Sequence, residues 1–116
     1  MEWWREQEAR NEVRFRAQNE WIEQASQSFA STAATDTFVC ECGDATCAQP
    51  ISLTTAEYEH VRSVATHFVV AVNHEDPEVE RLVSENGRYA VVEKIFGSAL
   101  RLARATDPRS AGGRRE

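Results

Sequence analysis

Apolar positions in the first 29 residues follow a helical period, and no proline or glycine interrupts them. The main apolar row, spaced by seven residues, is Phe15, Ile22 and Phe29. A second, adjacent row is Val13, Ala17 and Trp21. The pattern predicts one long amphipathic helix from Trp3 to about Phe29, with both apolar rows packed on the rest of the chain.

Polar and aromatic residues of this helix suggest further roles. Glu12, Arg16 and Glu20 are spaced by four residues, so we expect charged pairs that stabilise the helix surface. Trp3 and Trp4 stand among charged residues before the main apolar row begins, and exposed tryptophans are favoured anchors for a protein partner or a second copy of the chain. A fold-back of these tryptophans onto the body is the alternative. The residues predicted to bind a partner are Trp3, Trp4, Asn11, Phe15 and Asn19.

Asn11 and Asn19 are included because they flank Phe15 on one helical face. Their amides can meet a partner, or they can meet strands of the same chain. The sequence pattern does not decide whether these asparagines serve partner recognition or folding.

The pattern changes to short apolar segments after a polar connector at residues 30–37. Segments 38–41 and 51–53 are predicted strands, and segment 68–72 is apolar on both alternating faces, as a central strand is. Thr54-x-x-Glu57 is a capping box, which predicts a helix over residues 55–64.

Residues 76–95 allow two interpretations. Asp76-Pro77 resembles a helix start and Asn86-Gly87 a helix stop, which favours a short helix followed by a strand over residues 89–95. In the alternative, Asn86-Gly87 is the turn of a hairpin between strands 79–85 and 88–95. A last helix is predicted over residues 98–105.

Together these elements predict an α+β fold with a long N-terminal helix, a small sheet with a loop between two short strands, and two or three further short helices. The expected division is an N-terminal helix at 1–30, an α+β domain at 31–106 and a flexible tail at 107–116.

The charge distribution disfavours nucleic acid as a partner. The 116 residues carry a formal net charge of -6. Acidic residues predominate over residues 31–96, and only the C-terminal end, with five arginines after residue 96, is cationic. No apolar run is long enough for a membrane span, and the N-terminal residues lack the order of a secretory signal, so we expect a cytoplasmic protein.

Cys40, Cys42 and Cys47 are the only cysteines and lie within eight residues. Side chains at i and i+2 of a strand project to one side, and a loop opened by Gly43 can return a third sulfur to the same point. This spacing predicts a tetrahedral zinc site that lacks one ligand. The loop between the two short strands is then a zinc knuckle, and the domain at 31–106 is zinc-stabilised. Geometry favours His74, at a turn after the central strand, and leaves His67, His60 and a water open.

Several classes of chemistry fit the sequence less well. Iron–sulfur clusters usually take four thiolates, and neither the zinc-deaminase motif nor a phosphate-binding glycine loop is present. No residue is predicted to be catalytic, which argues against an enzyme. We expect a zinc-binding interaction or regulatory protein; the alternatives are a thiol-based redox or zinc-release sensor and a nucleic-acid or ribosome-associated factor.

Four motifs resemble a family of small, uncharacterised actinobacterial proteins, over most of residues 11–108. They are Asn11-Glu-x-x-Phe15-Arg16-x-x-Asn19-Glu20, Phe38-Val-Cys-Glu-Cys-Gly-Asp-x-x-Cys47, Leu53-Thr-x-x-Glu57-Tyr58-Glu59-x-Val61-Arg62 and Phe68-Val-Val-x-x-x-His74-Glu75-x-Pro77-Glu78-Val79-Glu80. The resemblance implies that His74 is the fourth ligand, and it implies no activity. Asn73 stands where the family often has glycine, and asparagine is also tolerated in a left-handed turn. The family frequently has arginine at the position of His67, so His67 is a weaker candidate for the fourth ligand.

Overall fold

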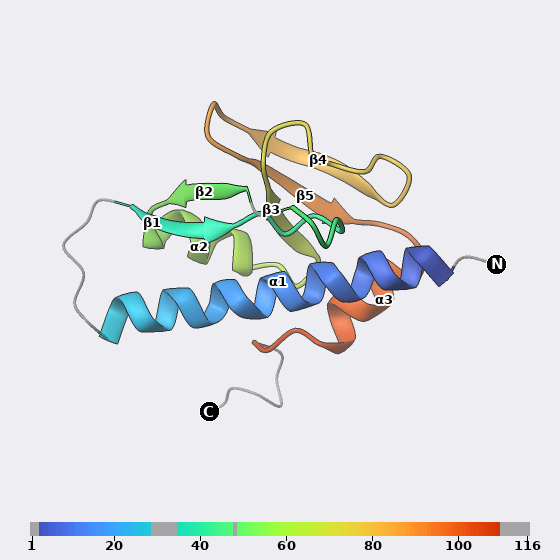
Figure 1. Cartoon of the computed structure of the whole chain (residues 1–116), viewed down its shortest axis with the longest axis horizontal. Helices are drawn as coiled ribbons and strands as arrows, with labels where there is room; N and C mark the ends of the chain where they lie inside the picture. The colour runs from blue at the N-terminus through green and yellow to red at the C-terminus, as the bar shows by residue number, and fades with distance from the viewer. Residues whose placement is uncertain (1–2, 29–34, 48, 110–116) are drawn as a thin grey trace.

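The structure, a computed structural model of the chain, describes residues 3–28, 35–47 and 49–109 (Figure 1). These residues form an α+β fold, as predicted. Its elements in chain order are α1 (Trp3–Ser28), β1 (Asp36–Val39), β2 (Pro50–Leu53), α2 (Thr55–Arg62), β3 (His67–Val70), β4 (Glu80–Glu85), β5 (Ala90–Lys94) and α3 (Gly97–Ala105).

Two antiparallel sheets form the body. One is the hairpin β1–β2, in which Phe38 is paired with Ile51. The other has the strand order β3-β5-β4 and pairs Val69 with Val91 across β3 and β5. The sheets meet where the backbone N–H of Glu41, just after β1, donates to the carbonyl of Val69 at 2.9 Å. Figure 1 shows α1 lying lengthwise along one side of this body, with α3 beside its N-terminal half.

The main core lies between the two sheets and α2. The Phe38 and Tyr58 rings stack there with their centroids 4.6 Å apart. Other fully buried side chains of this core are Ile51, Leu53, Val61, Phe68, Val69, Val70 and Val92. A smaller cluster of Ala9, Val79 and Ala99 joins α1 to α3. The core therefore uses the short apolar segments, whereas α1 contributes little apolar surface to it.

The predicted capping box is confirmed at the start of α2. The Thr54 hydroxyl accepts a hydrogen bond from the Glu57 N–H at 3.0 Å, and the Glu57 carboxylate accepts one from the Thr54 N–H at 2.8 Å. Two of the amides that a helix start leaves without partners are thereby satisfied. The helix begins at Thr55 as expected and ends at Arg62, two residues before the predicted end.

The predicted helix after Asp76-Pro77 is wrong, and the alternative hairpin is correct. Its turn lies at Gly87-Arg88 rather than at Asn86-Gly87, because the Asn86 N–H donates to the Tyr89 carbonyl at 3.0 Å. Asp76 starts only a turn, in which its carbonyl accepts from the N–H groups of Val79 and Glu80. The chain then extends as β4, which pairs with β5 from Glu80 opposite Lys94 to Glu85 opposite Ala90. Cross-strand pairing prevails over the local cap because one ladder satisfies the backbone of both segments.

The predicted packing of α1 is also wrong, because its most buried side is polar. Trp21 is 68% exposed, and Phe15 and Ile22 are only half-buried, although Ile22 does touch the main core. Phe29 lies outside the described residues. The buried polar positions of α1 are Asn11, Glu12, Arg16, Asn19, Glu20 and Glu23.

Counter-charges in the body explain this inverted packing. The Lys94 ammonium contacts the carboxylates of Glu12, at 2.8 Å, and Glu80. The fully buried Arg16 donates to the carbonyls of Ala65 at 2.6 Å and Ala103 at 2.9 Å, and its guanidinium lies over the Phe68 ring. Charged groups can be buried when each has such partners. Glu12, Arg16 and Glu20 are therefore interior residues, contrary to their predicted place on the helix surface.

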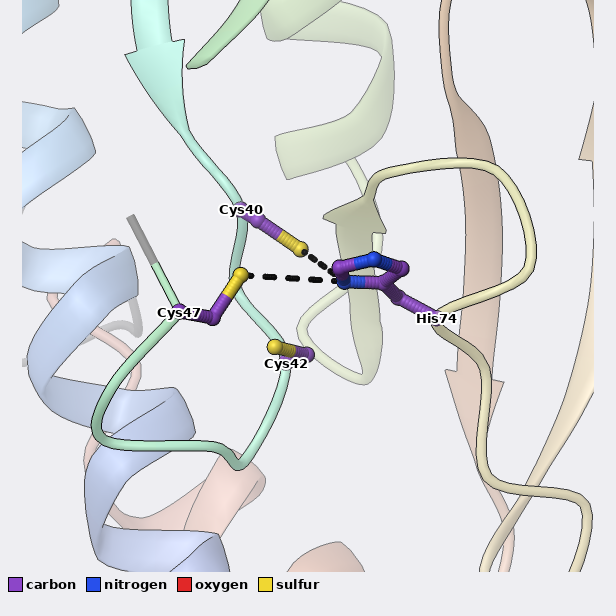
Figure 2. A group of neighbouring side chains, drawn as sticks. All are labelled: Cys40, Cys42, Cys47 and His74. Carbon is purple, nitrogen blue, oxygen red and sulfur yellow. Dashed lines mark hydrogen bonds between the residues drawn. The ribbon is translucent and has the colours of Figure 1, made fainter. Parts of the chain in front are cut away.

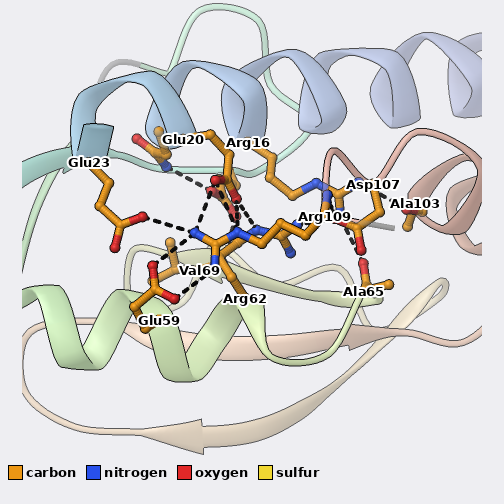
Figure 3. Close-up of polar contacts among 12 residues, drawn as sticks. Arg16, Glu20, Glu23, Glu59, Arg62, Ala65, Val69, Ala103, Asp107 and Arg109 are labelled. Atoms are coloured by element: carbon orange, nitrogen blue, oxygen red, sulfur yellow. Dashed lines mark hydrogen bonds and ion pairs between the residues drawn. The ribbon is translucent and has the colours of Figure 1, made fainter. Parts of the chain in front are cut away.

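A larger group of ion pairs anchors the C-terminal half of α1 (Figure 3). Arg62 of α2 pairs with Glu20 and with Asp107, which follows α3. Arg109 pairs with Glu20 at 3.0 Å and with Glu23 at 2.9 Å, and a third pair joins it to Glu59 at 2.8 Å. Asp107 and Arg109 were assigned to the tail by the sequence, yet they are anchored on α1 and α2. The remainder of that tail, 110–116, lies outside the described residues.

Candidate metal centre

Three cysteines and one histidine converge from two places in the chain (Figure 2). Cys40 directly follows β1, Cys42 and Cys47 lie in the loop to β2, and His74 follows β3. One ligand atom from each of the four residues lies within 4.8 Å of every other. The structure thus brings the three predicted cysteine ligands to one point together with His74.

A tight turn after β3 carries His74 to the cysteines. The His74 N–H donates to the carbonyl of Ala71 at 3.0 Å, and Asn73 between them has a φ of 74°. This is the left-handed conformation that asparagine tolerates better than most residues. His67 instead faces Glu93, with 3.9 Å between Nε2 and Oε2, and His60 is exposed on α2. His74 is therefore the histidine placed to be the fourth ligand.

The distances within the group fit a tetrahedral ion. His74 Nδ1 lies 3.5 Å from Cys40 Sγ and 3.7 Å from Cys47 Sγ. A tetrahedral zinc ion, with bonds of about 2.3 Å to sulfur and about 2.05 Å to nitrogen, places each sulfur about 3.6 Å from the nitrogen. The donor set and its spacing thus suit zinc, with Nδ1 as the ligand atom of His74.

Backbone amides support negative charge on all three sulfurs. Ala71 N–H donates to Cys40 Sγ at 3.1 Å, and the backbone amides of Asp44 and Gln49 donate to the sulfurs of Cys42 and Cys47. Hydrogen bonds of this kind stabilise the thiolate, which is the metal-binding form of cysteine.

The thiols differ in acidity. A hydrogen bond from the Cys40 thiol is the largest cause that lowers the pKa of Cys42, to about 5. The same hydrogen bond, followed by burial, raises the pKa of Cys40, and burial raises the pKa of Cys47. The hydrogen bond between Cys40 and Cys42 therefore favours one thiolate within this pair. A metal ion has to displace protons from the other two thiols, so its binding strengthens as the pH rises.

The cysteine loop is also in close contact with α1. Gly43 approaches α1 so closely that a Cβ on this residue would lie 2.8 Å from the Glu8 Cβ and 3.2 Å from the Glu12 Oε2 atom. The Asn11 amide donates to the Gly43 carbonyl at 2.9 Å. A side chain at position 43 would therefore push the loop and the helix apart.

Replacing Gly43 with alanine should destabilise the protein by about 1–3 kcal/mol, because overpacking forces such shifts. Urea unfolding of the metal-loaded protein measures the change. Gly87→Ala is the matched control, since a Cβ there meets nothing within 4 Å. Equal stabilities of the two variants would contradict the close approach of α1 at Gly43.

An open cavity of about 600 Å³ lies beside the metal ligands, with Cys42 and His74 in its wall. Its acidic lining residues are Glu8, Glu12, Asp44, Glu75, Asp76 and Glu80. Burial raises the pKa of Glu12 to about 7 although Lys94 lowers it. Three thiolates also exceed the charge of a divalent ion, so a loaded site stays negative. The cavity consequently disfavours phosphates and other anions.

The predicted partner-binding residues differ in where they lie in the structure. Asn11 and Asn19 are buried and bonded to the protein's own backbone, which favours folding, one of the two reasons left open by the sequence. Asn19 donates to the carbonyl of Val39 and accepts from its N–H, each at 2.8 Å. Phe15 is half-buried. Trp3 and Trp4 are the first residues of α1, and their side chains lie outside the described part of the chain.

Sequence reasoning missed Glu41, which is fully buried between Cys40 and Cys42. Its carboxylate accepts hydrogen bonds from the Asn19 amide at 2.8 Å and from the Val69 N–H at 3.0 Å. The sequence did contain a signal for Glu41. This residue lies between two ligands in a predicted strand, so its side chain faces away from the metal and toward the interior.

Comparisons with family models, with curated proteins and with solved structures gave no match. Within the described residues, no helix combines the length and the apolar character that crossing a membrane requires. The fold and the site therefore define the molecule only as an α+β protein with a candidate metal centre of three cysteines and one histidine.

Proposed function

We propose that this chain is a zinc-binding interaction or regulatory protein, in which zinc has a structural role. The observation that carries the proposal is the convergence of the four ligand atoms within 4.8 Å. The resemblance to the actinobacterial family, which implies the same ligand set, supports it.

A structural role is favoured over a catalytic one by the ligand number. Four protein ligands complete a tetrahedral zinc ion, whereas catalytic zinc keeps a position open for water. Cys40 and Cys42 are also buried, and Cys47 is half-buried. The ion would tie the β1–β2 loop to the turn after β3, where the Ala71 N–H already donates to Cys40 Sγ.

Elemental analysis tests the proposal directly. Protein purified without added metal should contain about one zinc ion per chain, and Cys47→Ala and His74→Ala should each lower this occupancy because a closed site needs all four ligands. His60→Ala is the matched control, since His60 is exposed on α2. Zinc below trace level in the unchanged chain would reject the proposal.

The same assay separates a structural site from a thiol-based redox or zinc-release sensor. Only Cys47 among the ligating thiols is partly accessible to an oxidant. For a structural site, we expect zinc to stay bound under mild hydrogen peroxide until the protein unfolds. Release of zinc from the folded protein would favour the sensor instead.

A protein partner or self-association fits the surface better than nucleic acid does. Trp21 on α1 is 68% exposed, which leaves part of this helix available for contact. Arg109 is occupied by three carboxylates and is not available to a phosphate backbone. We place the protein in the cytoplasm, where a reducing environment keeps the thiols free to bind metal.

A further inference from the structure

Residues 39–43 connect the metal ligands to α1. The thiols of Cys40 and Cys42 lie in the cluster with His74 (Figure 2). The residues between and beside these cysteines contact α1: Asn19 bonds the backbone of Val39 and the carboxylate of Glu41, and Asn11 bonds the carbonyl of Gly43.

The asparagines of α1 form hydrogen bonds with the backbone of this segment, as a neighbouring strand would. Asn19 both donates to and accepts from the backbone of Val39, as a paired strand residue would. Eight residues earlier, Asn11 bonds the carbonyl of Gly43. The Glu41 carboxylate, which Asn19 also contacts, accepts from the Val69 N–H of β3, and Cys40 Sγ accepts from the Ala71 N–H just after β3. The position of both thiols therefore depends on α1 as well as on the sheet.

The inner side of α1 can also become hydrated. Its buried residues are mostly charged or amide side chains, which water solvates well when a helix leaves its site. An apolar helix face would resist such release much more strongly. Docking of α1 therefore depends mainly on polar contacts, and those at residues 39–43 are among them.

We propose that α1 is a functional part of the metal centre, with Asn11 and Asn19 as positioning residues, so that metal occupancy and docking of α1 are coupled. Loss of the metal loosens residues 39–43 and releases α1. By thermodynamic reciprocity, loosening α1 weakens metal binding by the same factor. This inference rests on the proposed metal site.

Zinc affinity tests one direction of the coupling. Asn19→Ala and Asn11→Ala are titrated with zinc in competition with a chromophoric chelator. We expect each to weaken affinity about tenfold or more, the usual effect of losing a group that orients a ligand. Gln18→Ala is the control because Gln18 is exposed on the same helix, and its affinity should not change. Asn11→Ala, which loses a single contact with the loop, keeps the test valid if Asn19→Ala does not fold.

Amide hydrogen exchange tests the other direction. Chelation of zinc should accelerate exchange over residues 11–23 about tenfold or more while β5 keeps its protection. The coupling is overturned if α1 keeps its protection without zinc, if α1 and β5 lose protection together, or if both asparagine variants bind zinc as the unchanged chain does. Absence of zinc binding by the unchanged chain would instead refute the metal site itself.

Discussion

Removing the metal should lower the midpoint of thermal unfolding by about 10–20 °C. A ligand present at a thousand times its dissociation constant stabilises the folded state by about 4 kcal/mol. In a chain of this size, each kcal/mol changes the midpoint by several degrees. The effect is large because the ion would join two segments that are far apart in the chain, the β1–β2 loop and the turn after β3. Differential scanning calorimetry with and without a chelator measures the shift.

Re-addition of zinc should restore the original midpoint, which separates metal loss from damage by the chelator. The Cys42→Ser variant should unfold near the chelated midpoint and should not respond to zinc, because it removes one of the four ligands that a closed tetrahedral site needs. A shift of less than about 2 °C on chelation would show that the site, even if occupied, does not hold the fold together.

Replacing Arg62 with methionine should destabilise the protein by about 3–5 kcal/mol, the usual cost of leaving a buried charge without its partner. Arg62 is fully buried and lies between the carboxylates of Glu20 and Asp107 (Figure 3). Methionine fills a similar space but leaves Asp107 without its ion-pair partner and Glu20 with Arg109 alone. Chemical denaturation of the metal-loaded protein measures the loss.

Arg81→Met is the control for this prediction. Arg81 pairs with Glu93 at 2.7 Å, but its side chain is 61% exposed, and exposed pairs contribute about 0–1 kcal/mol. Similar losses in the two variants would mean that the interior pairs at Arg62 do not stabilise α1 and the C-terminal segment.

Local features of the chain were readable from its sequence. The capping box at Thr54, the span of α1 and the cysteine spacing depend on residues at most a few positions apart, so their structural meaning needs no distant partner. The cysteine spacing predicted a metal site for the same reason, because a strand and a short loop suffice to gather three sulfurs.

Contacts between distant residues decided the rest. Residues 80–85 became a strand because β5 was available to pair with them, although their flanks resemble helix signals. His74 was one of several possible fourth ligands until the left-handed turn at Asn73 placed it beside the cysteines. The polar side of α1 faces inward because Lys94 and Arg62, far along the chain, neutralise Glu12 and Glu20 there. Amphipathic periodicity finds a helix, but the charges that meet it in the folded protein determine which of its faces is buried.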